Sequence, residues 1–164
     1  MVSIELPVNA YIPDDYINDR TLKMSFYQRL ANLERPEQVE AMMAEMADRF
    51  GAPPEPVSHL LELVRLKTEA AALGYEAISG RGGEIVFKLR KTTRIDRVAL
   101  VKRFRTAALV QLGEVRLPSR VLSDEPGKLI AEVRELLPAL VGAKPVVAPD
   151  ASATAAASGA KLGR

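Results

Sequence analysis

The chain has 164 residues, of which 48% are hydrophobic and 27% charged, the proportions of an ordinary globular domain. It has no cysteine and one histidine, His59, which excludes disulfides, thiol catalysis and cysteine-based metal sites and disfavours a serine–histidine triad. No apolar run approaches the roughly 20 residues of a membrane span, and no signal-peptide pattern opens the chain. We therefore expect a cytoplasmic protein that has no membrane partner.

The formal net charge of +2 conceals a segregation of charge along the chain. Residues 1–87 carry 8 basic and 14 acidic side chains, a balance of −6. Residues 88–105 carry 8 basic and 1 acidic, a balance of +7, and residues 106–164 carry 7 basic and 6 acidic. This distribution predicts two surfaces of opposite sign, which concerns binding partners rather than fold.

The chain opens with a strand pattern and then becomes helical. Residues 2–8 alternate apolar and polar side chains, and Pro7 places a strand end or a sheet edge there. Asn18 or Asp19 can cap a helix over about residues 19–34. The apolar stripe of that helix is Leu22, Phe26, Leu30 and Leu33.

A second helix is predicted over residues 36–50, since Pro36 suits a first helical turn and Gly51 a left-handed end. Its apolar face comprises Val39, Met42, Met43, Met46 and Phe50. Three carboxylates fall within roughly 80° of one another on the opposite side: Glu37, Glu45 and Asp48. An i,i+3 pair such as Glu45 and Asp48 on a rigid helix can accept hydrogen bonds from planar guanidinium groups.

A proline-stiffened corner at residues 53–56 leads to a third helix over about residues 57–73. Leucine and valine cover most of its circumference, and its narrow polar stripe is Ser58, Glu62, Arg65 and Glu69. A helix this apolar is normally buried on two sides. We therefore expect it to be the core element of the domain.

From Tyr75 the apolar period changes from helical to alternating. Residues 75–80 and 84–90 flank a glycine-rich turn and predict a β-hairpin. The segment 80–83 lacks the Lys-Ser/Thr pair of a phosphate loop, which favours the turn. A short basic helix is expected over residues 95–107. Its apolar side would hold Ile95, Val98, Val101 and nearby Leu109, with Arg97, Lys102, Arg103 and Arg105 around the rest.

Two short strands broken at Gly113 and a helix over about residues 127–140 complete the pattern. The order of elements predicts an α+β fold in which a helical N-terminal half packs with a small antiparallel sheet of hairpins and a C-terminal helix. Residues 1–141 form the expected domain. Residues 142–164, rich in Ala, Ser, Gly and Pro, are expected to be a disordered tail.

The residues carry no recognisable catalytic set. The carboxylate pairs Asp14–Asp15 and Glu45–Asp48 lack the further ligands that a metal site needs. Carboxylate pairs on helix faces are usually solvated. No cofactor, metal or small-molecule substrate is expected, and the chain is not predicted to be an enzyme. Pattern alone indicates an α+β interaction domain.

Four segments, in the same order, resemble the C-terminal (TRCF) domain of the bacterial transcription-repair coupling factor family (Mfd). The resemblance covers about residues 3–141. Its residues are Ile12-Pro13-x-x-Tyr16-Ile17, Ser25-Phe26-Tyr27-Gln28-Arg29-Leu30, Asp48-Arg49-Phe50-Gly51-x-Pro53-x-x-Pro56, and Leu60-Leu61-x-x-x-Arg65-Leu66-Lys67 with Leu73-Gly74-Tyr75.

The resemblance implies a regulatory domain of an ATP-dependent DNA translocase that removes stalled RNA polymerase and recruits UvrA in nucleotide excision repair. In the family this domain packs against the UvrB-homology module of the same protein, masks the surface that UvrA binds and restrains the motor. UvrA, RNA polymerase and DNA are then indirect partners. Glu45 and Asp48 match acidic positions that face arginines of that module, and Glu37 shares their side of the helix.

Two alternatives stay open. The carboxylates of the second helix can simply be solvated. The basic segment 88–105 can bind nucleic acid directly, with Arg94, Arg97, Lys102, Arg103 and Arg105 neutralising phosphates. Few aromatic residues lie near that segment, which gives stacking on single strands little support.

Overall fold

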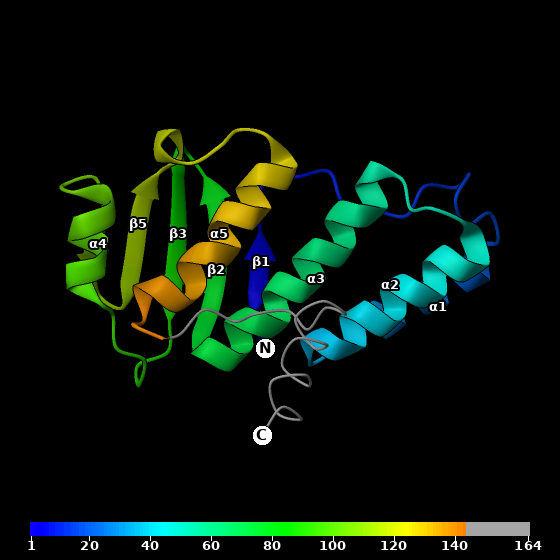
Figure 1. Cartoon of the computed structure of the whole chain (residues 1–164), viewed down its shortest axis with the longest axis horizontal. Coiled ribbons are helices and arrows are strands. Elements are labelled where there is room, and N and C mark those ends of the chain that lie inside the picture. Colours follow the sequence, from blue (N-terminus) through cyan, green and yellow to red (C-terminus); the bar gives the residue numbers. More distant parts are fainter. Residues whose placement is uncertain (144–164) are drawn as a thin grey trace, which may run out of the picture.

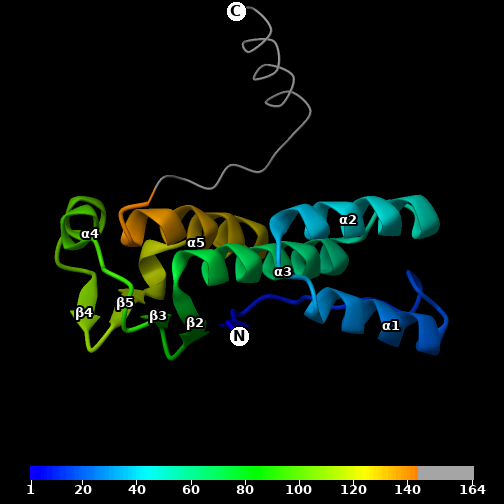
Figure 2. The ribbon, with the colours of Figure 1, turned by 90° about the horizontal axis from the view of Figure 1, so that it is seen from below.

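The computed structural model describes residues 1–143, which form a five-stranded sheet with helices over one face and a helical extension beyond its edge (Figures 1 and 2). The helices are α1 (Arg20–Ala31), α2 (Pro36–Phe50), α3 (Glu55–Leu73), α4 (Arg97–Phe104) and α5 (Pro126–Leu140). The strands are β1 (Ser3–Glu5), β2 (Tyr75–Arg81), β3 (Glu84–Leu89), β4 (Leu109–Gln111) and β5 (Glu114–Pro118). The predicted α+β class is confirmed. Within residues 1–143, no helix is both long and apolar enough to cross a membrane.

The sheet has the order β1-β2-β3-β5-β4, and one pairing departs from the expected antiparallel arrangement. β1 lies parallel to β2, with Ser3 opposite Ala77 and Glu5 opposite Ser79. The remaining pairs are antiparallel. Hairpin strands are neighbours in sequence, whereas β1 reaches its partner only after the crossover through α1, α2 and α3. Parallel strands require such a long connection, and no local turn motif in the sequence identifies which strands will pair.

The helix ends follow the local chemistry of the sequence. Asp19 caps α1 by accepting a hydrogen bond from the Leu22 amide at 2.9 Å. Pro36 lies in the first turn of α2, and Gly51 and Gly74 end α2 and α3 with φ of 88° and 90°. α3 begins two residues earlier than expected because its first turn accommodates Pro56.

The third helix, α3, is shared between two apolar clusters, as expected for a helix buried on two sides. Its first half contributes Val57 and Leu61 to a cluster with α1 and α2. Its second half contributes Leu66 and Ala70 to a cluster with the sheet and α5. Figure 2 shows α3 running from the α1–α2 end of the molecule to the sheet end. This helix therefore joins both halves of the domain.

The polar stripe predicted on α3 is only partly solvated. Glu62 is exposed, but Arg65 and Glu69 are 8% and 2% exposed. Arg65 forms an ion pair with Glu40 of α2, and the Arg134 Nε of α5 donates to both oxygens of Glu69 at 2.6 and 2.8 Å. These charges are buried because α2 and α5 cover them and each supplies a counter-charge.

The predicted orientation of α4 is wrong for three of the four apolar residues expected on its apolar side, and only Ile95 packs against the sheet cluster as expected. Val98, Val101 and Leu109 are 65%, 59% and 52% exposed, whereas Leu100 is buried and Phe104 packs against the sheet cluster. α4 has eight residues, little more than two turns, so its apolar residues define more than one possible inner side. The predicted tail lies, from residue 144 onward, outside the described residues.

Candidate interaction surfaces

The acidic face predicted on the second helix exists on α2 and is set by packing on the other side. Val39, Met42 and Met46 are at most 4% exposed and fix the rotation of the helix. Glu37 and Asp48 therefore point outward, about 20° apart around the axis and about 16 Å apart along it. The exposed residues between them in sequence are Ala41, Ala44 and Ala47, of which Ala41 and Ala44 lie closest to the line that joins the two carboxylates. Neither carboxylate forms an ion pair with any residue in the range 1–143.

Glu45, the third predicted binding residue, is already held within its own domain. Arg29 of α1 donates to its two oxygens at 2.6 and 2.7 Å, and Arg49 donates to Oε2 at 3.2 Å. Chiefly because of the bonds from Arg29, the pKa of Glu45 falls to about 2. The Arg29 and Arg49 guanidinium groups also lie 4.9 and 5.3 Å from the centre of the Phe26 ring.

This arrangement limits what Glu45 can offer to a partner. A carboxylate has about four acceptor positions, and three are occupied here. Arg49 forms its ion pair with Glu45 within α2, at i,i+4. The role of Arg29 was missed, although it belongs to the motif Ser25–Leu30, because no sequence spacing connects α1 to α2. Beside Glu45, a concavity of ≈ 370 Å³ is lined by Arg29, Asn32, Leu33, Gln38, Ala41, Met42 and Glu45.

Other residues of the resemblance motifs hold α2 in place. The Tyr16 hydroxyl donates to the Gly51 carbonyl at 2.9 Å and approaches the Met46 carbonyl at 3.2 Å. The Phe50 ring packs against Tyr16 and Phe26, with centroids 5.7 and 5.4 Å apart. Burial raises the pKa of Tyr16. These contacts fix the C-terminal end of α2, next to Asp48, against the preceding loop and α1.

The basic residues predicted to contact nucleic acid lie on α4 and beside it in sequence, and α4 is at the opposite end of the long axis from α1 and α2 (Figure 1). Arg97, Lys102 and Arg103 lie on α4, Arg105 directly follows it, and Arg94 lies in the preceding loop. All five are exposed, and none forms an ion pair within the described part of the chain. The two predicted surfaces of opposite sign thus lie far apart.

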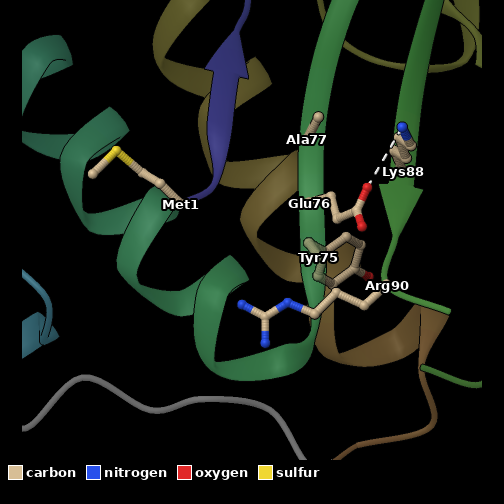
Figure 3. A pocket seen from close by; sticks show the side chains of 6 residues that line it. All are labelled: Met1, Tyr75, Glu76, Ala77, Lys88 and Arg90. Carbon is tan, nitrogen blue, oxygen red and sulfur yellow. Dashed lines mark ion pairs between the residues drawn. The ribbon is translucent and has the colours of Figure 1, made fainter. Parts of the chain in front are cut away.

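Figure 3 shows another hollow, a ≈ 420 Å³ concavity beside β2 and β3. Lys88 pairs with Glu76 at 3.5 Å, and Arg90 extends past Tyr75 away from that pair. The Tyr75 hydroxyl donates to the Leu137 carbonyl at 2.7 Å, and burial raises its pKa, so it is not poised for proton transfer. Across residues 1–143, no three His, Asp or Glu side chains gather in a way that could hold a metal ion.

The single histidine, His59 on α3, lies at the edge of the core. His59 is 7% exposed, and its Nδ1 lies 3.3 Å from the Asn9 carbonyl oxygen. Its Nε2 lies 3.9 Å from the exposed Glu55 carboxylate one turn earlier. Among residues 1–143, no hydroxyl group is hydrogen-bonded to the imidazole ring. The imidazole therefore links α3 to the loop that follows β1.

Comparison with known proteins finds one matching family model, the TRCF domain, over residues 6–100. The transcription-repair-coupling factor of Escherichia coli is 37% identical over 86 residues, 51% of this chain. Those of Rickettsia prowazekii and Myxococcus xanthus are each 30% identical over 82% of this chain. The chain spans only 8% to 12% of the length of these three relatives.

Among solved structures, a crystal structure of the C-terminal domain of a transcription-repair coupling factor has a similar fold. The TM-score is 0.66, and the superposition covers 80% of this chain and 88% of the other. Sequence identity is 20%. At this identity, the likeness concerns the fold alone.

Proposed function

The chain belongs to the TRCF domain family, and from this premise we propose that it is a regulatory interaction domain of a transcription-repair-coupling factor. In this proposal it has no catalytic role of its own. It docks on the UvrB-homology module of the same protein, restrains the motor and covers the surface that UvrA binds. DNA and RNA polymerase are engaged by other parts of that protein.

The observation that carries the proposal is the outward line of α2. Glu37 and Asp48 mark the ends of this line, the small side chains of Ala41 and Ala44 allow close approach between them, and neither carboxylate is paired within residues 1–143. Guanidinium groups match carboxylates in shape as well as charge. A module presenting arginines at a similar spacing would fit this face.

Glu45 has a second role in this contact. Because Arg29 and Arg49 occupy most of its acceptor positions, Glu45 contributes at most one further bond, and the concavity beside it is available to an apolar side chain of the partner. Exposed ion pairs contribute about 0–1 kcal/mol each. A contact built from a few of them is weak enough to open, as a regulatory contact must be.

The test measures binding of this chain to the isolated UvrB-homology module by calorimetry. The double variant Glu37→Gln/Asp48→Asn should bind about tenfold more weakly, which corresponds to about 1.4 kcal/mol. Its melting temperature should stay within about 2 °C of the parent, because neither side chain makes an ion pair in its own domain. Equal affinity of the double variant and the parent would refute the acidic contact.

Two further variants separate carboxylates that bind the partner from carboxylates that stabilise the domain. Glu62→Gln removes an exposed carboxylate from α3 and serves as the matched control, with no change in affinity expected. Glu45→Gln should lower the melting temperature more than the double variant does, because it breaks the bonds from Arg29 and Arg49. Its effect on affinity should be smaller. The opposite ranking would assign the contact to Glu45 instead.

A further inference from the structure

The outward side of α4 presents apolar and basic side chains on one stripe. Val98, Val101 and Lys102 stand at i, i+3 and i+4 on α4, so their side chains are neighbours on the helix surface. Together with Arg105, which directly follows the helix, they are here called the α4 face. The two valines are 65% and 59% exposed. Leu100 and Phe104 already pack the inner side of α4 against the sheet cluster, so the two valines do not contribute to the domain's core.

The charge of this face is not compensated nearby. Lys102 and Arg105 form no ion pair with residues 1–143, and Arg97 and Arg103 flank them. The only acidic residue of this segment, Asp96, caps α4 by accepting from the Ala99 amide at 3.0 Å. No carboxylate therefore lies on the α4 face itself. A ligand for the face needs negative charge together with apolar surface.

Backbone strain is concentrated in the same part of the chain. Arg105 and Leu112 have φ of 55° and 51° and are the only non-glycine residues with positive φ among residues 1–143. They bracket β4, which is the edge strand at the α4 end of the molecule (Figure 2). Leu112 is 93% exposed at the hairpin tip. Such outliers are destabilising and often accompany function.

We propose that the α4 face is a docking site for an acidic amphipathic segment of another polypeptide. Carboxylates of that segment would pair with Lys102 and Arg105 while its apolar side chains cover Val98 and Val101. A nucleic acid would supply the negative charge, but its phosphates leave the valines exposed. Residues 144–164 carry one acidic and three basic side chains, the wrong balance for covering this face. With about two helical turns available, the contact is small and transient.

The experiment follows the backbone amide signals of the full chain by NMR during titration. The probe is a synthetic helical peptide of about 15 residues with glutamates and leucines on one face. A second peptide has the same glutamates but glutamine in place of leucine. A short DNA duplex is the third ligand. The leucine peptide should shift signals of residues 97–105 and bind at least about tenfold more tightly than the glutamine peptide.

Paired variants divide the face into its two components. Val98→Ser/Val101→Ser and Lys102→Gln/Arg105→Gln should each weaken binding of the leucine peptide by about tenfold or more. Arg20→Gln, an exposed arginine on α1, is the matched control and should leave affinity unchanged. Retained dispersion of the amide signals shows that each variant is folded. These substitutions do not touch α2, so the result is independent of the contact proposed for Glu37 and Asp48.

Several outcomes would overturn the docking site. Equal binding of both peptides would show that charge alone attracts them. Duplex binding that the serine variant leaves unchanged would assign the face to nucleic acid. Concentration-dependent shifts at residues 97–105 without any ligand would identify a second copy as the occupant. Absence of shifts with the leucine peptide would remove the site altogether.

Discussion

At the scale of single residues, the number of carboxylates on α2 is larger than the number that remain unpaired on its surface. The helix carries Glu37, Glu40, Glu45 and Asp48, yet Arg65 pairs with the second and Arg29 with the third. Only the first and last remain without ion pairs among residues 1–143. Apart from the Arg49 contact with Glu45, the counter-charges come from α1 and α3. The sequence of α2 by itself therefore does not separate the paired carboxylates from the unpaired ones.

Arg29→Met tests how Glu45 is held. Removing the bidentate donor should raise the pKa of Glu45 from about 2 toward its ordinary value of 4.5, measured by NMR titration of the side-chain carboxyl. The folded pKa is depressed, so the stabilisation is present above the unfolded pKa of about 4.5 and is lost as pH falls toward 2. The variant should lose most of this acid dependence. Its loss of stability near neutral pH should be no more than about 1 kcal/mol, because the pair is partly exposed.

The matched control is Arg49→Met, which removes one bond at 3.2 Å and leaves both bonds from Arg29 intact. It should move the pKa of Glu45 upward by less than Arg29→Met does. An unchanged pKa in the Arg29 variant would contradict the assignment of Arg29 as the main cause of the depressed value.

At the scale of secondary structure, the sequence predicted what is decided locally. The Asp19 cap, Pro36 and Gly74 locate helix ends because each acts through its own backbone neighbours. The parallel pairing of β1, the inner side of α4 and the burial of Arg65 and Glu69 were not predicted. Each depends on which distant element covers a residue, and a single sequence without long-range pairing information does not specify that.

The same limit applies to the interaction surfaces. The position of Asp48 on the outward side of α2 follows from helical periodicity and was predicted. The engagement of Glu45 by Arg29 and the exposure of Val98 and Val101 were not, since both result from packing between elements. Periodicity identifies the side of a helix on which a residue lies, whereas contacts with other elements decide whether that side is available.

Arg134→Met tests the buried contact between α3 and α5. Glu69 is 2% exposed, and without Arg134 its carboxylate would lose both of its hydrogen bonds from a guanidinium group at a buried position. Removing Arg134, the more exposed partner of this pair, should reduce the free energy of unfolding by about 3 kcal/mol, measured by urea denaturation. Glu69→Gln should cost less because the Arg134 side chain, 33% exposed, can reach water.

The control for this prediction is Arg116→Met on the open face of the sheet. Arg116 pairs with Glu84 and Glu114 at 3.0 Å, but its side chain is 37% exposed and its partners are also solvated. Its loss should therefore cost less than about 1 kcal/mol. Equal costs for Arg116→Met and Arg134→Met would mean that burial of Glu69 does not determine the energetics of the pair.

At the scale of the whole molecule, α3 connects the two ends because it packs into both apolar clusters. Its 19 residues span about 28 Å, from the α1–α2 cluster to the sheet cluster. α2, which carries the acidic face, lies toward one end, and α4, which carries the α4 face, lies at the other (Figure 1). Because one continuous helix contributes to both cores, the orientation of the two faces relative to each other should be fixed in the folded domain.

This architecture predicts cooperative unfolding of both ends. Leu61 and Leu66 are fully buried, the first in the α1–α2 cluster and the second in the sheet cluster. Leu61→Ala and Leu66→Ala should each cost about 2–5 kcal/mol. In hydrogen exchange by mass spectrometry under conditions where global opening dominates, each variant should lower protection in β3 and in α2 alike, because α3 cannot lose one core and keep the other. If Leu61→Ala lowered protection in α2 while β3 stayed as protected as in the parent, the two halves of the domain would unfold separately. Binding of a partner at one end would then not depend on the fold of the other end.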